Sequence, residues 1–129
     1  MRTKILIIED DLMTAKLYEE IFKAEGFEIE NVDCGKKAIE VLEEIRKGKK
    51  EKPDLILLDL ILPDMHGIEI LKEAKKHPET REIKIFALTN YSSPESDKEL
   101  IEEGIDKILV KARYTLKEIS ALIKEAFKK

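Results

Sequence analysis

Five short apolar runs alternate along this chain with five longer amphipathic segments, and this alternation constrains the fold more than any other feature. Runs of four to six residues bounded by turn residues predict strands. They lie at 4–8, 27–32, 54–59, 83–88 and 107–110. The run at 27–32 alternates apolar and acidic residues, so that strand is expected to be half-exposed. Alternating strand–helix units require parallel strands, right-handed crossovers and helices on both faces of one sheet. The sequence therefore predicts an α/β fold of the (βα)5 type, doubly wound around a five-stranded parallel sheet.

Helices are predicted between the strands from apolar residues spaced three or four positions apart and from capping residues at their ends. They are expected at 11–25, 36–47, 68–76, 94–104 and 116–127. The first helix is expected to bury Leu17, Ile21 and Ala24 on one face. Thr115 and Glu118 form a predicted capping box at the start of the last helix.

Length and charge narrow the classes of function. A chain of 129 residues has room for one domain, since domains usually have roughly 100–200 residues. Its 28 acidic residues outnumber its 24 basic ones, which argues against direct nucleic-acid binding because such domains are usually basic. No apolar stretch approaches the roughly 18 residues that span a bilayer, and the single Cys34 cannot form an internal disulfide. We expect a cytoplasmic protein without membrane contact.

The composition is rich in charge: Asp, Glu, Lys and Arg make up 40% of the chain, and Gln is absent. Enrichment in Lys and Glu with few thermolabile residues is typical of thermophile proteins. An AT-rich genome also favours codons for Lys, Glu and Ile. A thermophile origin and codon bias therefore both stay open as explanations.

Chemically active side chains stand at the ends of four of the five predicted strands. Glu9 and Asp10 follow the first strand, Asp59 ends the third, Thr89 follows the fourth and Lys111 follows the fifth. Ligands of doubly wound folds bind outside the carboxyl ends of the strands. We therefore expect acids, a hydroxyl and an amine to share one pocket at that edge of the sheet.

This set of groups fits magnesium-assisted phosphoryl transfer. Neighbouring carboxylates raise one another's pKa unless a cation intervenes, and hard oxygen ligands favour Mg²⁺. Asp59 can act as an oxygen nucleophile that forms an aspartyl-phosphate. Lys111 can neutralise the phosphoryl oxygens, and Thr89 can donate its hydroxyl to them. Asp11 opens a predicted helix, so we interpret it as an N-cap rather than a ligand.

The joint pattern resembles the receiver domain of two-component response regulators over essentially the whole chain. The motifs that carry the resemblance are Glu9-Asp10-Asp11, Asp59-Leu60-Ile61-Leu62-Pro63-Asp64-Met65-His66-Gly67, Leu88-Thr89 and Val110-Lys111. Thr89 follows Asp59 by 30 positions, and Lys111 follows Thr89 by 22. The resemblance implies a flavodoxin-like sheet with strand order 2-1-3-4-5, in agreement with the predicted parallel fold.

The resemblance also implies a role for each site residue. Asp59 is the implied phosphoacceptor, phosphorylated by a histidine kinase or a phosphotransfer protein. Thr89 is the implied switch hydroxyl, and Lys111 is the implied contact to the phosphoryl group. The implied ligands of Mg²⁺ are Asp10, Asp59, the backbone carbonyl of Ile61 and, through water, Glu9.

Two positions depart from the usual pattern of the family. Ala112 follows Lys111, where the family usually has a proline after a cis bond. A cis bond before a non-proline residue costs about 2.5–4 kcal/mol, so we predict a trans bond with Lys111 still pointing inward. Ile108 stands where the family often has an aromatic side chain that swings on activation, so a ring-based switch is not possible there.

Two bulky residues lie close to the site in the sequence. Ile61 stands two positions after Asp59, and Tyr91 stands two positions after Thr89. One hypothesis is that they limit the access of water and lengthen the life of the phosphorylated state. The alternative is that Tyr91 simply packs on the surface.

The leading hypothesis is a stand-alone receiver domain over residues 1–129, without an output domain, that signals through protein–protein contacts and is not an enzyme. The family uses the face of the fourth helix, fifth strand and fifth helix for output. Here that face would include Lys98, Ile101, Glu102, Lys107 and Lys117. The sequence does not identify the downstream protein that would bind there.

Three other hypotheses stay open. Ala112 and Ile108 favour a pseudo-receiver that binds partners without phosphate, and the intact set of acids, hydroxyl and lysine argues against it. A phosphohydrolase would need a second acid two residues past its nucleophile, where this chain has Ile61. A flavodoxin would need a phosphate loop after the first strand, where the acids would repel phosphate. A measurement of phosphate uptake would distinguish the receiver hypothesis from the pseudo-receiver hypothesis.

Overall fold

The computed structural model describes residues 2–128, which form five parallel strands that alternate with five α-helices. The strands are β1 (Lys4–Ile8), β2 (Glu28–Val32), β3 (Leu55–Asp59), β4 (Lys84–Thr89) and β5 (Lys107–Val110). The helices are α1 (Leu12–Ala24), α2 (Gly35–Arg46), α3 (Gly67–Lys76), α4 (Pro94–Glu102) and α5 (Leu116–Ala126). A 3₁₀ turn, η1 (Lys111–Arg113), follows β5. The predicted (βα)5 alternation is confirmed.

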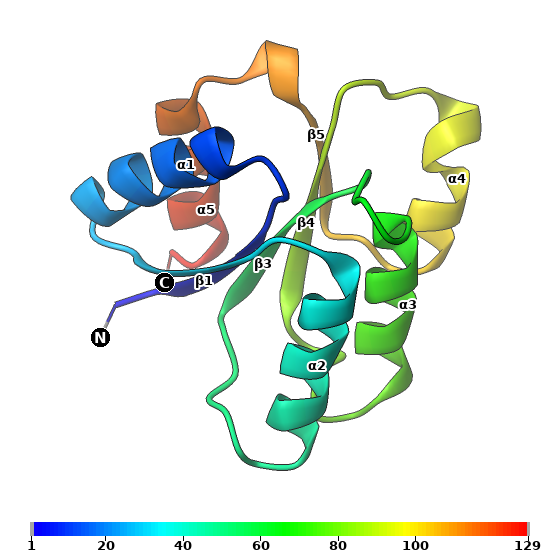
Figure 1. Cartoon of the computed structure of the whole chain (residues 1–129). Coiled ribbons are helices and arrows are strands. Elements are labelled where there is room, and N and C mark those ends of the chain that lie inside the picture. Colours follow the sequence, from blue (N-terminus) through cyan, green and yellow to red (C-terminus); the bar gives the residue numbers. More distant parts are fainter. Residues whose placement is uncertain (1, 129) are drawn as a thin grey trace.

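The strand order in the sheet is β2-β1-β3-β4-β5, and each neighbouring pair is parallel (Figure 1). This is the order that the resemblance implied. The strand order reverses between β1 and β3. These two strands are neighbours in the sheet although α1, β2 and α2 lie between them in the chain. Ile8 pairs with Leu58, so the segments that leave these two strands start side by side. The carboxyl edge at this switch point is where doubly wound folds bind ligands.

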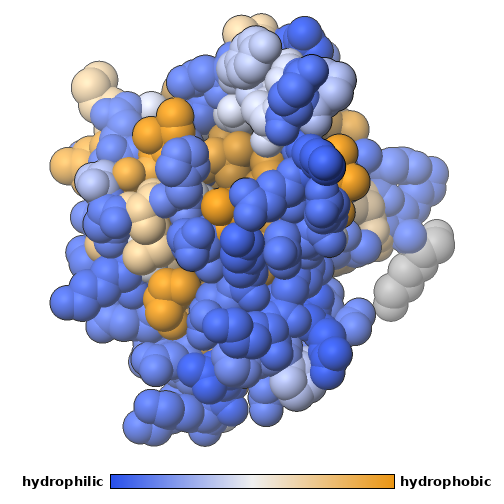
Figure 2. Space-filling view, turned by 90° about the vertical axis from the view of Figure 1, so that its right-hand side faces the viewer, coloured by the Kyte–Doolittle hydropathy of each residue, from blue (hydrophilic) through white to orange (hydrophobic). Residues whose placement is uncertain are grey.

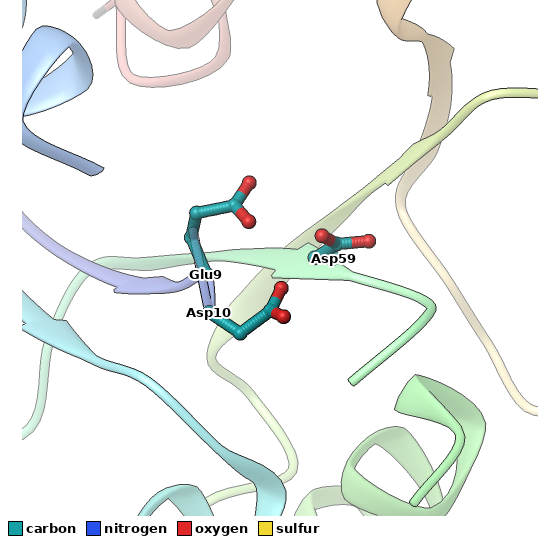
Figure 3. A group of neighbouring side chains, drawn as sticks. All are labelled: Glu9, Asp10 and Asp59. Atoms are coloured by element: carbon teal, nitrogen blue, oxygen red, sulfur yellow. The ribbon is translucent and has the colours of Figure 1, made fainter. Parts of the chain in front are cut away.

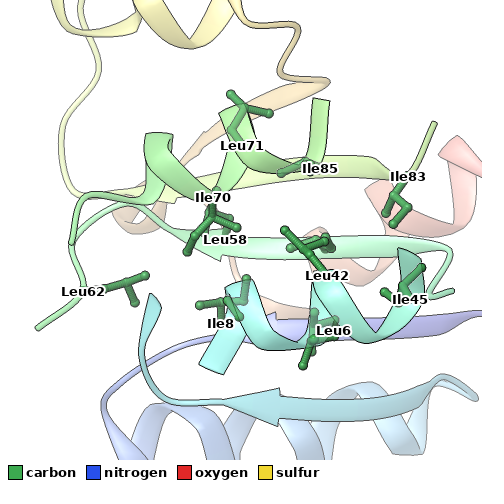
Figure 4. Close-up of a cluster of buried hydrophobic side chains, with 14 of the residues drawn as sticks. Leu6, Ile8, Leu42, Ile45, Leu58, Leu62, Ile70, Leu71, Ile83 and Ile85 are labelled. Atoms are coloured by element: carbon green, nitrogen blue, oxygen red, sulfur yellow. The ribbon is translucent and has the colours of Figure 1, made fainter. Parts of the chain in front are cut away.

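Helices cover both faces of the sheet: α1 and α5 lie on one side, and α2, α3 and α4 lie on the other (Figure 1). The core therefore has two halves. Aliphatic side chains such as Leu42 and Ile70 fill the half under α2 and α3 (Figure 4). Phe22 and Phe27 belong to the half under α1 and α5. Because both faces of β3 are covered, its residues 55–58 are all apolar and fully buried.

The face that α1 buries differs from the predicted one. Its buried residues are Ala15, Tyr18 and Phe22, whereas Leu17 is 50% exposed. The rings of Tyr18 and Phe22 stack with their centroids 5.8 Å apart, and Phe22 meets Phe27 edge-on at 6.2 Å. Burying two aromatic rings removes more apolar surface from water than burying Leu17 would. The prediction was wrong for Leu17 and Ala24, which are exposed, while Ile21 is partly buried against this half of the core. It followed the aliphatic residues of the helix and not the aromatic ones.

The predicted helix caps are in place, and the predicted bounds of the elements are correct to within two residues. Asp11 is the N-cap of α1, and its carboxylate accepts a hydrogen bond from the N–H of Thr14 at 3.1 Å. Thr115 and Glu118 form the capping box of α5 with reciprocal bonds of 2.8 and 3.1 Å. Among the helices described within residues 2–128, none is long and apolar enough to cross a membrane.

We predict that Phe22→Ala lowers the free energy of unfolding by about 3–5 kcal/mol, because the ring is fully buried and its removal leaves a cavity. Leu17→Ala is a control on the same helix and should cost about 1 kcal/mol or less, since half of that side chain faces solvent. Urea denaturation followed by circular dichroism measures both changes. Equal losses in the two variants would contradict the observed orientation of α1.

Candidate functional site

Three carboxylates lie together at the carboxyl edge of the sheet. Glu9 and Asp10 follow the end of β1, and Asp59 is the last residue of β3. Each offers an oxygen, and these oxygens all lie within 4.8 Å of one another (Figure 3). Glu9 and Asp59 are buried, while Asp10 is exposed. The pairing of β1 with β3 thus brings together the acids that the sequence places at two separate strand ends.

Lys111 brings a positive charge to this cluster from a distant part of the chain. Its Nζ lies 3.4 Å from Asp59 Oδ2 and 3.5 Å from Glu9 Oε1. The residue opens the turn η1 directly after β5, and no peptide bond within residues 2–128 is cis. The predicted trans bond between Lys111 and Ala112 is therefore confirmed, and the side chain still reaches the acids.

Burial and like charge perturb the cluster. The pKa of Glu9 is raised above its ordinary value of 4.5, first because burial disfavours the carboxylate and also because Asp59 repels it. The N–H of Asp11, which donates to Glu9 Oε2 at 3.1 Å, and the Lys111 ammonium act in the opposite direction. Burial alone would lower the pKa of Lys111, but Asp59 and Glu9 outweigh it and raise that pKa. The site therefore keeps its amine charged and disfavours ionisation of Glu9.

The loop between β3 and α3 is hydrogen-bonded to residues at the end of β3. The N–H of Ile61 donates to Asp59 Oδ1 at 3.1 Å, and the N–H of Gly67 donates to the Leu60 carbonyl at 2.7 Å. A Cβ atom at Gly67 would lie 2.8 Å from the Asp59 carbonyl oxygen, closer than real Cβ contacts, so glycine is required there. Ile61 and His66 also form an antiparallel bridge across the loop. These contacts hold the backbone of Ile61 directly beside the Asp59 carboxylate.

Thr89 is placed differently from the other predicted site residues. It is the last residue of β4, and its hydroxyl donates to the Tyr91 carbonyl at 2.9 Å. The same hydroxyl accepts a hydrogen bond from the N–H of Tyr91 at 3.2 Å. The backbone of the loop before α4 therefore engages the hydroxyl. If Thr89 turned toward Asp59, this local turn would open and the start of the loop would be released.

A cavity of about 320 Å³ lies beside this loop, on the side of the molecule that carries α4. Its walls include Ile61, Ile68, Thr89, Tyr91 and Leu100. Figure 2 looks onto this side and shows apolar side chains among hydrophilic ones. Ile61 and Tyr91 are 66% and 68% exposed. The sequence did not predict this cavity, because three separate segments of the chain form its walls.

Asp64 had no predicted role, yet its carboxylate accepts hydrogen bonds from the N–H groups of Gly35 and Lys36, each at 2.8 Å. It lies in the loop between β3 and α3, and these N–H groups begin α2. The only signal in the sequence was the lack of a usual capping residue at Cys34 before that helix. Such a signal does not indicate which distant residue takes over the capping.

Comparisons with known proteins agree with this fold. A family model described as the response regulator receiver domain matches residues 5–124. The polar-differentiation response regulator DivK of Brucella anthropi is 33% identical over 104 residues, which cover 81% of this chain and 79% of DivK. The phosphorylated cyanobacterial phytochrome response regulator RcpA has a TM-score of 0.81 and 25% identity, covering 98% of this chain and 91% of RcpA. The Mn²⁺-bound form of response regulator Rcp1 has a TM-score of 0.79 and 28% identity, covering 97% and 93%.

The fold and the site together define a doubly wound α/β protein that carries acids and a lysine at the switch point of its sheet. The match of the family model makes the assignment specific. This chain belongs to the response regulator receiver domain family of two-component signalling. The resemblance inferred from the sequence motifs is therefore confirmed.

We predict that Glu9→Gln stabilises the folded protein, and increasingly so as the pH rises above 4.5. The folded state holds the Glu9 proton more tightly than the unfolded chain, whose carboxyl has the ordinary pKa of 4.5. Ionisation of Glu9 therefore lowers the free energy of unfolding as the pH rises through the raised pKa. Glutamine avoids this loss and keeps an oxygen for the N–H of Asp11, so its advantage over glutamate is expected to be largest near neutral pH.

Urea denaturation of both proteins from roughly pH 4 to pH 8, with a metal chelator present, measures this difference. Carboxyl groups away from the site titrate in the same way in both proteins, so the difference between the two curves reports on Glu9 and the groups that interact with it. A difference that stays constant over the whole range would contradict the raised pKa of Glu9.

Proposed function

We propose that this receiver domain accepts a phosphoryl group on Asp59 in a Mg²⁺-dependent reaction and signals through protein–protein contacts. The proposal rests on Lys111, whose Nζ lies within 3.5 Å of oxygens of both Asp59 and Glu9, beside the third acid Asp10. An oxygen nucleophile flanked by an amine and by oxygen ligands is the arrangement that phosphoryl transfer needs. The similar protein RcpA is described as phosphorylated, which supports the same chemistry in this chain.

The donor atoms fit Mg²⁺. Carboxylate oxygens within 4.8 Å of one another are hard ligands, and a divalent cation would relieve the repulsion that contributes to the raised pKa of Glu9. Asp10, Asp59 and the Ile61 carbonyl would hold the ion directly, and Glu9 would hold it through water. When bound, the ion supplies positive charge beside the transferring phosphoryl group. The Mn²⁺-bound form of the similar protein Rcp1 supports divalent-cation binding by this chain.

Each side chain has a defined part in the proposed transfer. A carboxylate oxygen of Asp59 forms the new oxygen–phosphorus bond while the bond from phosphorus to the donor breaks, and the donor leaves with that electron pair. The N–H of Ile61 on Oδ1 and Lys111 near Oδ2 orient the carboxylate before the reaction. Lys111 then neutralises the phosphoryl oxygens. Thr89 leaves the backbone of Tyr91 and donates its hydroxyl to the same group.

The proposed phosphoryl donor is a histidine kinase or a phosphotransfer protein, as family membership suggests. The chain would then be a phosphoacceptor and not an enzyme that acts on a separate substrate. A downstream protein is proposed to bind the face formed by α4, β5 and α5. The exposed residues of this face include Lys98, Ile101, Glu102, Lys107 and Lys117.

Charge on α4 indicates what kind of partner would bind. Residues 94–103 carry five acids and one lysine, a net charge that equals the −4 of the whole chain. The remaining residues are therefore neutral in sum. A partner that brings basic groups to the acids of α4, acidic groups to Lys107 and Lys117, and an apolar group to Ile101, which is 63% exposed, fits this face best.

A phosphate-independent interaction module is the second candidate. The Thr89 hydroxyl favours it, because that hydroxyl is engaged by the backbone of Tyr91. Ile108 also favours it, since an aliphatic residue provides no ring to swing on activation. The inward position of Lys111 argues against it, because an interaction module has no need of an amine held between two buried acids.

Incubation with a small-molecule phosphodonor and Mg²⁺ is predicted to add one phosphoryl group, as measured by intact mass. Asp59→Asn should gain none, because an amide is not a nucleophile here, and chelation of Mg²⁺ should abolish the gain in the wild type. Asp33→Asn, a change at a surface acid that pairs with Lys37, is the matched control and should gain the group normally. A folded wild type that gains nothing would favour the phosphate-independent module.

Ile61→Asn and Tyr91→Ala are each predicted to shorten the lifetime of the phosphorylated protein severalfold, because both remove bulk beside Asp59 and Thr89 and admit water. The fraction that stays phosphorylated over time, followed by intact mass after removal of the phosphodonor, measures this. Ile101→Asn removes an exposed apolar side chain from α4 and should leave the lifetime unchanged. If the wild type loses its phosphoryl group rapidly and neither substitution changes the rate, the two side chains do not shield the site.

A further inference from the structure

The N-terminus of α2 is capped by a residue from a different part of the chain. Cys34 occupies the N-cap position but makes no side-chain capping bond. Instead, the two carboxylate oxygens of Asp64 accept hydrogen bonds from the N–H groups of Gly35 and Lys36, each at 2.8 Å. The N–H of Lys36, followed by that of Gly35, lowers the pKa of Asp64. A charged carboxylate therefore lies at the positive end of the helix dipole.

Close packing between Gly35 and Met65 adds to these hydrogen bonds. A Cβ atom at Gly35 would lie 2.3 Å from Met65 Cγ, so the first residue of α2 leaves room for the neighbour of Asp64. The tip of the loop between β3 and α3 is thus attached to α2 both by polar bonds and by close contact.

The base of the same loop reaches Asp59. The N–H of Ile61 donates to Asp59 Oδ1 at 3.1 Å, and Ile61 forms an antiparallel bridge with His66 on the other side of the loop. Gly67 closes the base through its hydrogen bond to the Leu60 carbonyl. The loop is therefore held at two places, at its base beside Asp59 and at its tip against α2.

We propose that Asp64 is a positioning residue for the phosphoryl site: by tying the tip of the loop to α2, it fixes the Ile61 backbone against the Asp59 carboxylate. The part of this inference that concerns Mg²⁺ rests on the proposed function, in which the Ile61 carbonyl is a ligand. A displacement of about 1 Å at such a position is enough to weaken a site strongly. Loss of a group that supports a metal ligand typically reduces metal affinity about 10- to 100-fold.

The dissociation constant of Mg²⁺, measured by isothermal titration calorimetry, tests this role. Asp64→Ala is expected to weaken Mg²⁺ binding about tenfold, and Asp64→Asn is expected to weaken it less, because the amide oxygen still accepts a hydrogen bond. Two controls should bind Mg²⁺ as the wild type does. Glu40→Gly weakens the same helix at an exposed position in its middle, and Asp33→Asn removes a negative charge just before that helix.

A second measurement needs no metal. Hydrogen exchange of the Ile61 amide, followed by NMR, should be faster in Asp64→Ala than in the wild type and unchanged in Glu40→Gly. Asp64→Asn takes over this comparison if the alanine variant does not fold.

The outcomes separate the two proposals. If Asp64→Ala loses thermal stability as Glu40→Gly does but keeps wild-type Mg²⁺ affinity and wild-type exchange at Ile61, Asp64 only caps α2 and the inference is overturned while the proposed function stands. If the wild type does not bind Mg²⁺, the proposed function fails. The exchange of the Ile61 amide then decides by itself whether Asp64 positions the loop.

Discussion

The crowding of Glu9, Asp10 and Asp59 at the carboxyl edge of the sheet is the constraint on which the rest of the site depends. Two of these acids are buried, and their mutual repulsion adds to the effect of burial in raising the pKa of Glu9. Lys111 offsets part of that repulsion. The repulsion that Lys111 does not offset explains why a cation is expected to bind. Positive charge placed among these oxygens relieves an unfavourable interaction that the fold already contains.

The fold holds these acids in place because the polar chemistry is confined to the ends of apolar strands. In β3, four consecutive buried aliphatic residues precede Asp59, and both faces of the strand are packed. The stability of the domain therefore comes from the middle of the sheet, and its carboxyl edge is free to carry groups that are unfavourable for folding. This separation is common in proteins, where functional sites are the places at which local rules for stability are broken.

The surface near the site is built in a way that suits transmission of a signal. Thr89 is linked by its hydroxyl to the backbone of Tyr91, in the loop that leads into α4. Leu100 is the one buried residue of α4, so this helix has little packing to resist displacement. The same helix carries most of the unbalanced acidic charge of the chain. In the proposed function, a rotation of Thr89 would therefore act on a lightly anchored and strongly charged element.

The sequence by itself determined the alternation of strands and helices, most of the helix caps and the acids and lysine at the strand ends. These features depend on local spacing and on the rule that parallel strands share one carboxyl edge, so the clustering of Glu9, Asp59 and Lys111 could be anticipated. The sequence also anticipated the trans bond after Lys111, because the energy of a peptide bond depends on the two residues that it joins.

Only the tertiary structure decided the features that arise from contacts between distant segments. The buried face of α1 depends on how Tyr18 and Phe22 fit against Phe27, and not on the spacing of residues within the helix. The partner of the Thr89 hydroxyl depends on the path of the next loop. The capping of α2 by Asp64 joins residues about 28 positions apart, and local preferences carry no information about such a pair. Local rules give the type and the ends of each element, while side-chain packing and hydrogen bonds between elements select one arrangement among many that those rules allow.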